Sequence, residues 1–182
     1  FYANWRKLGF NAISLFPRYW GASGPDARMQ EWLRQGQELG FKRIMNESPF
    51  HPMVKGQTPG SEVFSQLSDG KGKNLCPSYR GPLYQKEMQR VRHNVLQSRP
   101  DYVFWDAECW YHGAAEAAAC SRCSEAWKKS SLNLDDFLKT LGKELNQDLY
   151  DQVTAAAEEG GFPMPLVASY DRHASTPNYA LV

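Results

Sequence analysis

Short apolar runs alternate with longer amphipathic stretches along the chain. The apolar runs lie at residues 11–16, 41–45, 102–105 and 166–169, each of a length that suits a buried strand. Between them, apolar residues recur at helical spacing, and glycine or proline ends each stretch. Strands that alternate with helices form parallel βα units, so the pattern predicts an α/β fold. The helical stripes, which come after the end of a first helix at residues 1–8, are Met29, Trp32, Leu33 and Leu39; Tyr84, Met88, Val91 and Val95; and Leu138, Leu141, Leu145 and Leu149.

The entry to the first apolar run favours a (β/α)8 TIM barrel, of which the chain holds a part. Leu8–Ile13 looks like the "GxN" entry to the second strand of many barrels, which makes the visible strands the second to fifth of eight. The chain has 182 residues, whereas a barrel has about 250. We therefore expect residues 1–182 to form a single barrel domain or a fragment of one. The alternative is a small doubly wound sheet, although no glycine-rich phosphate loop follows any strand.

Polar and aromatic side chains follow every predicted strand. In a barrel, these positions converge on the carboxyl-terminal rim, where catalytic groups lie. Four such sets in the right place favour an active site over ordinary loop polarity. The sets are Arg18, Tyr19 and Trp20; Asn46, Glu47 and His51; Asp106 and Glu108; and Asp171, Arg172 and His173.

The third of these sets is the most informative. A buried apolar run ends there in two carboxylates, Asp106 and Glu108, with Trp105 and Trp110 beside them. Carboxylates supply proton transfer or attack in glycoside hydrolysis, and flat rings stack on pyranose faces. The alternative is a buried parallel strand that is followed by a polar loop without chemistry.

The composition and net charge limit the classes of partner that we expect the protein to bind. Apolar residues make up 42% and charged residues 23%, as in an ordinary globular domain. The aromatic content of 13%, with six tryptophans, suits a ring-rich core together with a sugar-binding groove. The net charge of +1 gives no electrostatic reason to expect nucleic acid or an anionic membrane. No apolar run approaches the length of a membrane span, and no signal peptide is recognised at the start of the sequence. The sequence does not decide the cellular compartment, and a secreted or periplasmic location is favoured.

Several short motifs resemble known glycoside hydrolases. Arg99–Asp106 resembles the strand that carries the nucleophilic aspartate in alpha-L-fucosidase-like enzymes. Leu75–Gly81, and Cys120-x-x-Cys123 with Trp127, are similar to glycoside hydrolases of the same barrel type, which often place a small cysteine cluster after the acidic strand. The resemblance implies that Asp106 is the nucleophile or charge stabiliser. Those families have glycine or a small residue after the aspartate, and the sequence here continues Ala107-Glu108, which leaves open which acid faces the substrate.

The Asn46-Glu47 pair supports a rival assignment. It resembles the acid/base site of another large barrel clan, in which the asparagine contacts the sugar 2-hydroxyl and the glutamate donates a proton. In that clan the pair ends the fourth strand, whereas this pair ends the third strand by our count. Substrate contact or a structural salt bridge are the alternatives for Glu47.

The cysteines suggest a small metal site. Cys109-x-x-His112 and Cys120-x-x-Cys123 have the residue types and pair spacings of a tetrahedral zinc site, within an insert at residues 109–123. A disulfide and plain buried thiols are the alternatives. A zinc ion with four protein ligands would be structural, because it would keep no position open for water.

The sequence therefore predicts a glycoside hydrolase that acts on a carbohydrate without a catalytic cofactor. The acid partner of Asp106 is Glu108, Glu47 or a residue on a strand that this sequence lacks. The alternative function is a carbohydrate-binding or scaffold barrel without catalysis, held by a structural zinc or disulfide. The sugar, the stereochemical course and the oligomeric state stay open. The expected substrate contacts are Trp20, Asn46, His51, Trp105, Trp110, Asp171 and Arg172.

Overall fold

The computed structural model describes residues 1–21, 23–106 and 114–170. The helices and strands alternate along the chain as the apolar pattern predicts. Their bounds are α1 Tyr2–Lys7, β1 Ala12–Leu15, η1 Pro17–Tyr19, α2 Ala27–Glu38, β2 Lys42–Glu47, α3 His51–Val54, α4 Pro82–Ser98, β3 Tyr102–Asp106, α5 Ala114–Ala119, α6 Ser121–Lys129, α7 Leu134–Gly160 and β4 Leu166–Tyr170.

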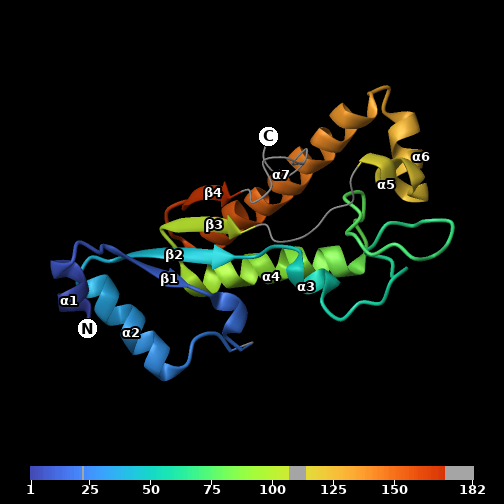
Figure 1. Cartoon of the computed structure of the whole chain (residues 1–182). Helices are drawn as coiled ribbons and strands as arrows, with labels where there is room; N and C mark the ends of the chain where they lie inside the picture. The colour runs from blue at the N-terminus through green and yellow to red at the C-terminus, as the bar shows by residue number, and fades with distance from the viewer. Residues whose placement is uncertain (22, 107–113, 171–182) are drawn as a thin grey trace.

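The strands form one parallel sheet in the order β1-β2-β3-β4. An α/β fold with a parallel sheet is therefore confirmed. Each strand lies next to the strand before it in sequence, whereas a doubly wound sheet reverses its strand order at a switch point. The described strands have no such reversal, which disfavours the doubly wound alternative. Figure 1 shows the strands running in one direction, toward the region of α3, α5 and α6.

The two faces of the sheet differ in what covers them. Ile13, Met45 and Val103 are buried, and they pack with residues of α2, α4 and α7. Their neighbours along the strands, which point the other way, are half-buried or exposed. Right-handed crossovers that always step in the same direction place their helices on one face. We call this covered side the helix face. The other side, on which no helix of the described residues packs, is called the helix-free face. It carries Ser14, Ile44, Asn46, Phe104, Asp106 and Ala168.

Two apolar clusters make up the core. The smaller one joins α1 and α2 to β1 through Tyr2, Ile13 and Leu33. The larger one lies between β2, β3, α4 and α7, and it extends to the loop that precedes α4. Figure 1 shows the first cluster's elements at the amino-terminal end of the molecule, away from α5 and α6. The catalytic strand predicted from the sequence, β3, belongs to the larger cluster.

Local signals explain the two long helices. Pro82 opens α4, and the predicted stripe from Tyr84 to Val95 is buried. The Asn133 side chain accepts a hydrogen bond of 2.9 Å from the Asp136 amide and so caps α7. Gly161, with φ 61°, ends α7 in the left-handed region that favours glycine.

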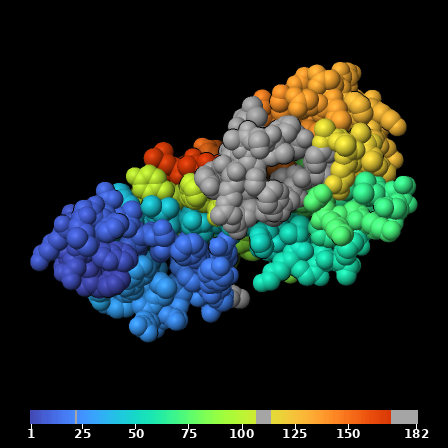
Figure 2. Space-filling view, viewed as in Figure 1, coloured from blue at the N-terminus to red at the C-terminus, as the bar shows by residue number. Residues whose placement is uncertain are grey.

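The long loop and the described part of the insert contain more regular structure than their sequences indicate. Residues 55–81 contain an antiparallel bridge between Phe64 and Leu75. The insert contributes α5 and the first turn of α6, and both helices lie beside this loop on the surface in Figure 2. The Ser121 amide donates to the Gln66 carbonyl at 3.0 Å and thereby joins the two segments. Within the described part of the chain, no helix is long and apolar enough to cross a membrane.

Candidate functional site

The carboxyl ends of β1, β2 and β3 bring several predicted residues to one end of the sheet. Asn46 pairs in register with Phe104, so Asn46 and Asp106 lie on the same face of neighbouring strands. Two residues along β3 and one strand across separate their backbones by about 8 Å. The prediction that strand ends gather polar groups at one edge is therefore met for these two residues.

Asp106 is the last residue of β3 and lies on the helix-free face. Its side chain is half-buried, and its Oδ1 atom is buried without a hydrogen-bond partner in the part of the chain that the structure describes. A buried polar atom without a partner costs about 1–3 kcal/mol. Such an atom in a folded protein is commonly matched by a ligand or an ordered water. Asp106 Oδ1 therefore has the capacity to accept a hydrogen bond from a group that the described residues do not provide.

Glu47 has the opposite orientation, and the expectation that it donates a proton to a substrate is corrected. It follows Asn46 directly in β2, so its side chain points to the helix face. Its side chain is 0% exposed, and its oxygens lie 3.0 Å from both terminal nitrogens of Arg90. Asn94 Nδ2 donates to Glu47 Oε2 at 2.8 Å. Glu47 thus forms a buried salt bridge, which was one of the alternatives for this residue.

Arg90 extends this network to a second carboxylate. Glu87, one turn earlier in α4, accepts hydrogen bonds of 2.7 and 2.8 Å from Arg90. The other role of Glu87 is to accept the Phe50 amide at 2.8 Å. Phe50 has φ 69°, an unusual value for a bulky residue, so this hydrogen bond holds the turn after β2. The network fixes the end of β2 against α4.

Trp105 also lies on the helix face. It is 3% exposed and packs in the larger core cluster. A ring with almost no accessible surface cannot stack on a sugar, so the expected substrate contact of Trp105 is corrected to a core position. The cause is again strand alternation, which places Asp106 and Trp105 on opposite faces.

Aromatic side chains near the end of β1 are accessible, unlike that of Trp105. Trp20 is half-buried and lines a hollow of about 560 Å³ together with Phe16, Tyr19 and Trp32. The preceding Arg18 donates from Nη1 to Ser48 Oγ at 2.5 Å and so joins the ends of β1 and β2. His51 is exposed at the start of α3. Trp20 and His51 are thus accessible, as a substrate contact requires.

The remaining predicted residues lie outside the described part of the chain. These are the candidate acid Glu108, the candidate substrate contacts Trp110, Asp171 and Arg172, and the candidate ligands Cys109 and His112. Their roles stay predictions.

Three cysteines form a compact buried cluster beside this end of the sheet. The Sγ atoms of Cys76, Cys120 and Cys123 all lie within 4.8 Å of one another, and each residue is at most 2% exposed. The Cys76 sulfur is 3.8 Å from that of Cys120 and 3.5 Å from that of Cys123. Three buried thiols at these separations can bind a metal ion. The sequence prediction that Cys120 and Cys123 belong to one cluster is therefore supported.

Cys76 was missed as a member of this cluster. It lies 44 residues before Cys120 and has no cysteine or histidine at ligand spacing. The fold brings it close, because the bridge between Phe64 and Leu75 turns the loop back and the Cys76 amide donates to the Val63 carbonyl at 2.9 Å. Its place in Leu75–Gly81, a motif quoted for the family resemblance, was the available signal.

Hydrogen bonds and charge surround the sulfur atoms. The Gln66 amide donates to Cys120 Sγ at 3.3 Å, and Ser78 Oγ lies 3.2 Å from Cys123 Sγ. The hydrogen bond with Cys123 and the nearby Arg122 guanidinium lower the pKa of Cys76 to about 6, although burial opposes the shift. The same shared proton raises the pKa of Cys123. The cluster therefore favours a thiolate at Cys76.

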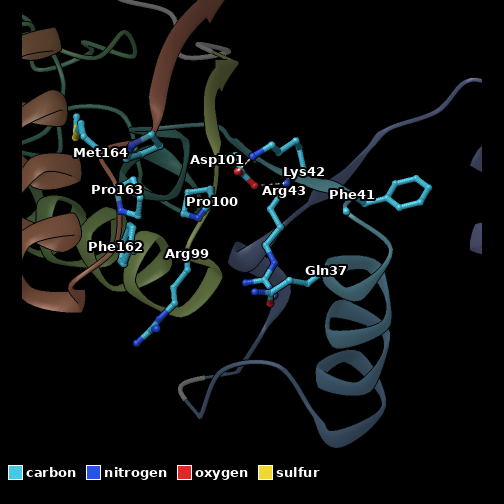
Figure 3. A pocket seen from close by; sticks show the side chains of 12 residues that line it. Gln37, Phe41, Lys42, Arg43, Arg99, Pro100, Asp101, Phe162, Pro163 and Met164 are labelled. Carbon is cyan, nitrogen blue, oxygen red and sulfur yellow. Dashed lines mark hydrogen bonds and ion pairs between the residues drawn. The ribbon is translucent and has the colours of Figure 1, made fainter.

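A second hollow, of about 490 Å³, lies at the opposite end of the sheet (Figure 3). Asp101 lines this hollow. Its Oδ1 atom accepts a hydrogen bond of 2.7 Å from Lys42 Nζ, and its Oδ2 atom accepts one of 2.9 Å from the Arg43 amide. These contacts tie the amino ends of β2 and β3 together. In barrels this end serves stability, whereas chemistry takes place at the carboxyl end.

Comparison with known proteins yields no match. No family model, no curated protein and no solved structure matches the chain. Its function is therefore inferred from the residues and their geometry.

Proposed function

We propose that the protein hydrolyses a glycosidic bond, with Asp106 as the nucleophile or as the carboxylate that stabilises an oxocarbenium-like transition state. The observation that carries the proposal is the buried Asp106 Oδ1 atom, which has no hydrogen-bond partner in the described structure. It lies at the carboxyl end of a parallel strand and on the helix-free face. A carboxylate held in this way meets developing positive charge with little competing solvation.

Asn46 is the second group that supports the proposal. It is half-buried on the same face, on the neighbouring strand. Its side chain has both a donor and an acceptor, as recognition of a sugar hydroxyl requires. Asn46 thus keeps the role of substrate contact, although its neighbour Glu47 loses the role of proton donor.

We propose fewer candidates for the carboxyl group that acts together with Asp106. Among the described strand residues, Asp106 and Glu47 are the carboxylates, and Glu47 is buried on the helix face in its salt bridge with Arg90. Glu108, which lies outside the described residues, and a residue on a strand absent from this sequence remain the proposed acids. Hydrolysis at a glycosidic bond requires this second carboxyl group.

We place this site in a (β/α)8 barrel, of which β1 to β4 are the proposed second to fifth strands. Three observations support the placement: the parallel pairing, the sequential strand order, and the helices packed on one face. Parallel sheets are normally covered on both faces. In a barrel, the helix-free face would turn inward and be covered by the other strands.

The rings at the end of β1 are proposed sugar-stacking surfaces. Trp20 is half-buried, and Tyr19 beside it is 76% exposed. Both line the hollow of about 560 Å³. Aromatic rings with one accessible face bury the apolar face of a pyranose at little entropic cost.

The cysteine cluster is proposed to be structural and to take no part in hydrolysis. Its three cysteines are buried in the core, at most 2% exposed, so solvent has little access to an ion bound there. Zinc is the proposed ion. No catalytic cofactor is required by a mechanism that uses two carboxyl groups.

A carbohydrate-binding protein without catalysis is the second candidate. It is favoured by one observation, namely that the helix-free face carries a single carboxylate among the described strand residues. A binding site needs polar groups and rings but no second acid.

Hydrolysis of a panel of aryl glycosides separates the two candidates. The wild-type protein is assayed beside Asp106→Asn and the matched control Asp101→Asn, which changes a carboxylate at the opposite end of the same strand. Hydrolysis that Asp106→Asn abolishes and Asp101→Asn preserves supports the glycosidase. Sugar binding by the wild type in calorimetry, without hydrolysis of any substrate, supports the second candidate.

A further inference from the structure

The sulfur–sulfur distances in the cysteine cluster match those around a metal ion. Two sulfurs bound at about 2.3 Å to one tetrahedral ion lie about 3.8 Å apart. The Cys76–Cys120 and Cys76–Cys123 distances are 3.8 and 3.5 Å. A disulfide would bring two sulfurs to about 2.05 Å, so neither pair is oxidised in this structure.

Two polar groups lie within hydrogen-bond distance of the sulfurs. The backbone amide of Gln66 points at Cys120 Sγ, at a distance of 3.3 Å. Ser78 Oγ is within hydrogen-bond distance of Cys123 Sγ, at 3.2 Å. Hydrogen bonds to ligating atoms orient the ligands and stabilise their charge in metal sites.

A positive charge near the sulfurs would offset the net charge of a metal-bound site. Three thiolates and one divalent cation carry a net charge of −1, which is costly in a buried site. The guanidinium of Arg122 supplies a positive charge next to Cys76. The same side chain donates to the Glu62 carbonyl at 2.9 Å and is stacked over the Tyr79 ring, so its position is fixed.

We propose that Cys76, Cys120 and Cys123 bind one zinc ion, which fastens the loop at residues 61–79 to α5 and α6. Cys120 caps α6 and Cys123 lies in its first turn, while Cys76 comes from the bridged part of the loop. Thiolates prefer zinc to calcium or magnesium, which prefer oxygen ligands. The ligand set differs from the sequence prediction by including Cys76.

The same two segments are joined by polar contacts on both sides of the sulfurs. Asn74 Nδ2 donates to Glu116 Oε2 at 2.6 Å, and the Ser121 amide donates to the Gln66 carbonyl at 3.0 Å. These contacts hold the sulfurs near one another before an ion binds. A preorganised site of this kind pays less of the ordering cost when the metal enters.

Metal analysis of the purified protein tests the proposal. We expect one zinc per chain after preparation in reducing buffer without chelator. Replacement by cobalt(II) should give the strong sulfur-to-metal charge-transfer absorption of a thiolate site. Cys76→Ser should lower zinc affinity at least tenfold and weaken that absorption, and so should Cys123→Ser. The matched control Val63→Ala removes buried volume from the same loop but keeps every sulfur, and it should bind zinc as the wild type does.

Two results would overturn the proposal. One is a wild-type protein that binds neither zinc nor cobalt with its thiols reduced. The other is zinc binding that Cys76→Ser leaves unchanged, because the ion would then lie elsewhere. If the serine variants do not fold, metal stoichiometry and the cobalt spectrum of the wild type still decide the matter. These measurements use no sugar, so they are independent of glycosidase activity.

Hydrogen exchange tests separately whether the ion holds the loop at residues 61–79 in place. Hydrogen exchange of peptides from residues 61–79 should become faster when a chelator removes the ion, whereas peptides from α2 should not change. Equal exchange in both regions, with and without zinc, would show that the ion does not hold the loop.

Discussion

At the scale of single residues, the environment of each carboxylate determines its role. Glu47 has no exposed surface and contacts Arg90, Asn94 and the Ser48 amide. Asp106 is half-buried, and one of its oxygens has no hydrogen-bond partner among the described residues. The first pattern stabilises the fold, and the second leaves binding capacity for a ligand.

Glu47→Gln should destabilise the protein by about 3 kcal/mol, because it leaves the Arg90 charge buried beside a neutral amide. Urea unfolding followed by circular dichroism measures this loss. The matched control is Glu159→Gln, which removes the exposed partner of Arg92 at 2.6 Å and should cost less than about 0.5 kcal/mol. Equal small effects of both substitutions would contradict the structural role of Glu47.

The sequence identifies the candidate residues but not the direction in which each one points. Asn46 and Glu47 form one motif, yet strand alternation separates them between two faces, and the face depends on where the helices pack. Trp105 and Asp106 are separated for the same reason. Cys76 is a different case, because its approach to Cys120 and Cys123 depends on the path of the long loop before α4, which contains no helix or strand from which its position could be predicted.

At the scale of elements, Asp101 links the amino ends of two strands. Hydrogen bonds from Lys42 and the Arg43 amide, together with their charges, outweigh burial and hold the Asp101 pKa below its usual value. A carboxylate with a lowered folded-state pKa adds stability above its unfolded-state pKa, and this stability is lost as the pH falls through the folded-state value.

Asp101→Asn should therefore reduce the free energy of unfolding by about 1 kcal/mol near neutral pH, a modest value because Lys42 is exposed. The difference between wild type and variant should shrink as the pH falls below about 4. Urea unfolding at several pH values measures it. A difference that is constant with pH would show that charge at Asp101 is not its source.

Most elements follow from apolar periodicity. The stripes of α4 and α7 are long and are bounded by proline, asparagine and glycine at the observed ends. The helices α5 and α6 have 6 and 9 residues, too short to be stable by themselves. They depend on packing against the loop that carries Cys76, so local sequence alone cannot predict them.

At the scale of the whole molecule, the cysteine cluster joins segments that are far apart in sequence. If zinc holds them, removal of the ion should lower the unfolding temperature, since a ligand that binds only the folded state stabilises it by mass action. Differential scanning fluorimetry with a chelator measures the shift, which zinc should reverse and magnesium should not. Cys76→Ser should show a smaller shift than wild type. A chelator effect of the same size in both proteins would contradict the assigned ligand set.

The parallel sheet organises the proposed active site at the same scale. Sequential strand order and one-sided helix packing bring Asn46 and Asp106 to one end of the helix-free face. The α/β class and the gathering of strand ends could be predicted from the sequence. Closure into a barrel is a proposal, because four strands define the direction of the crossovers but not the number of strands.

The most direct test of the central claim is the turnover of aryl glycosides by wild type and Asp106→Asn. The substitution keeps the shape of the side chain and removes its charge. We predict a folded variant with the wild-type unfolding temperature and with kcat/KM reduced at least about a thousandfold, equivalent to about 4 kcal/mol of transition-state stabilisation. Near-normal turnover by Asp106→Asn, together with activity lost in Glu47→Gln at unchanged stability, would contradict the account and assign the chemistry to the Asn46-Glu47 pair.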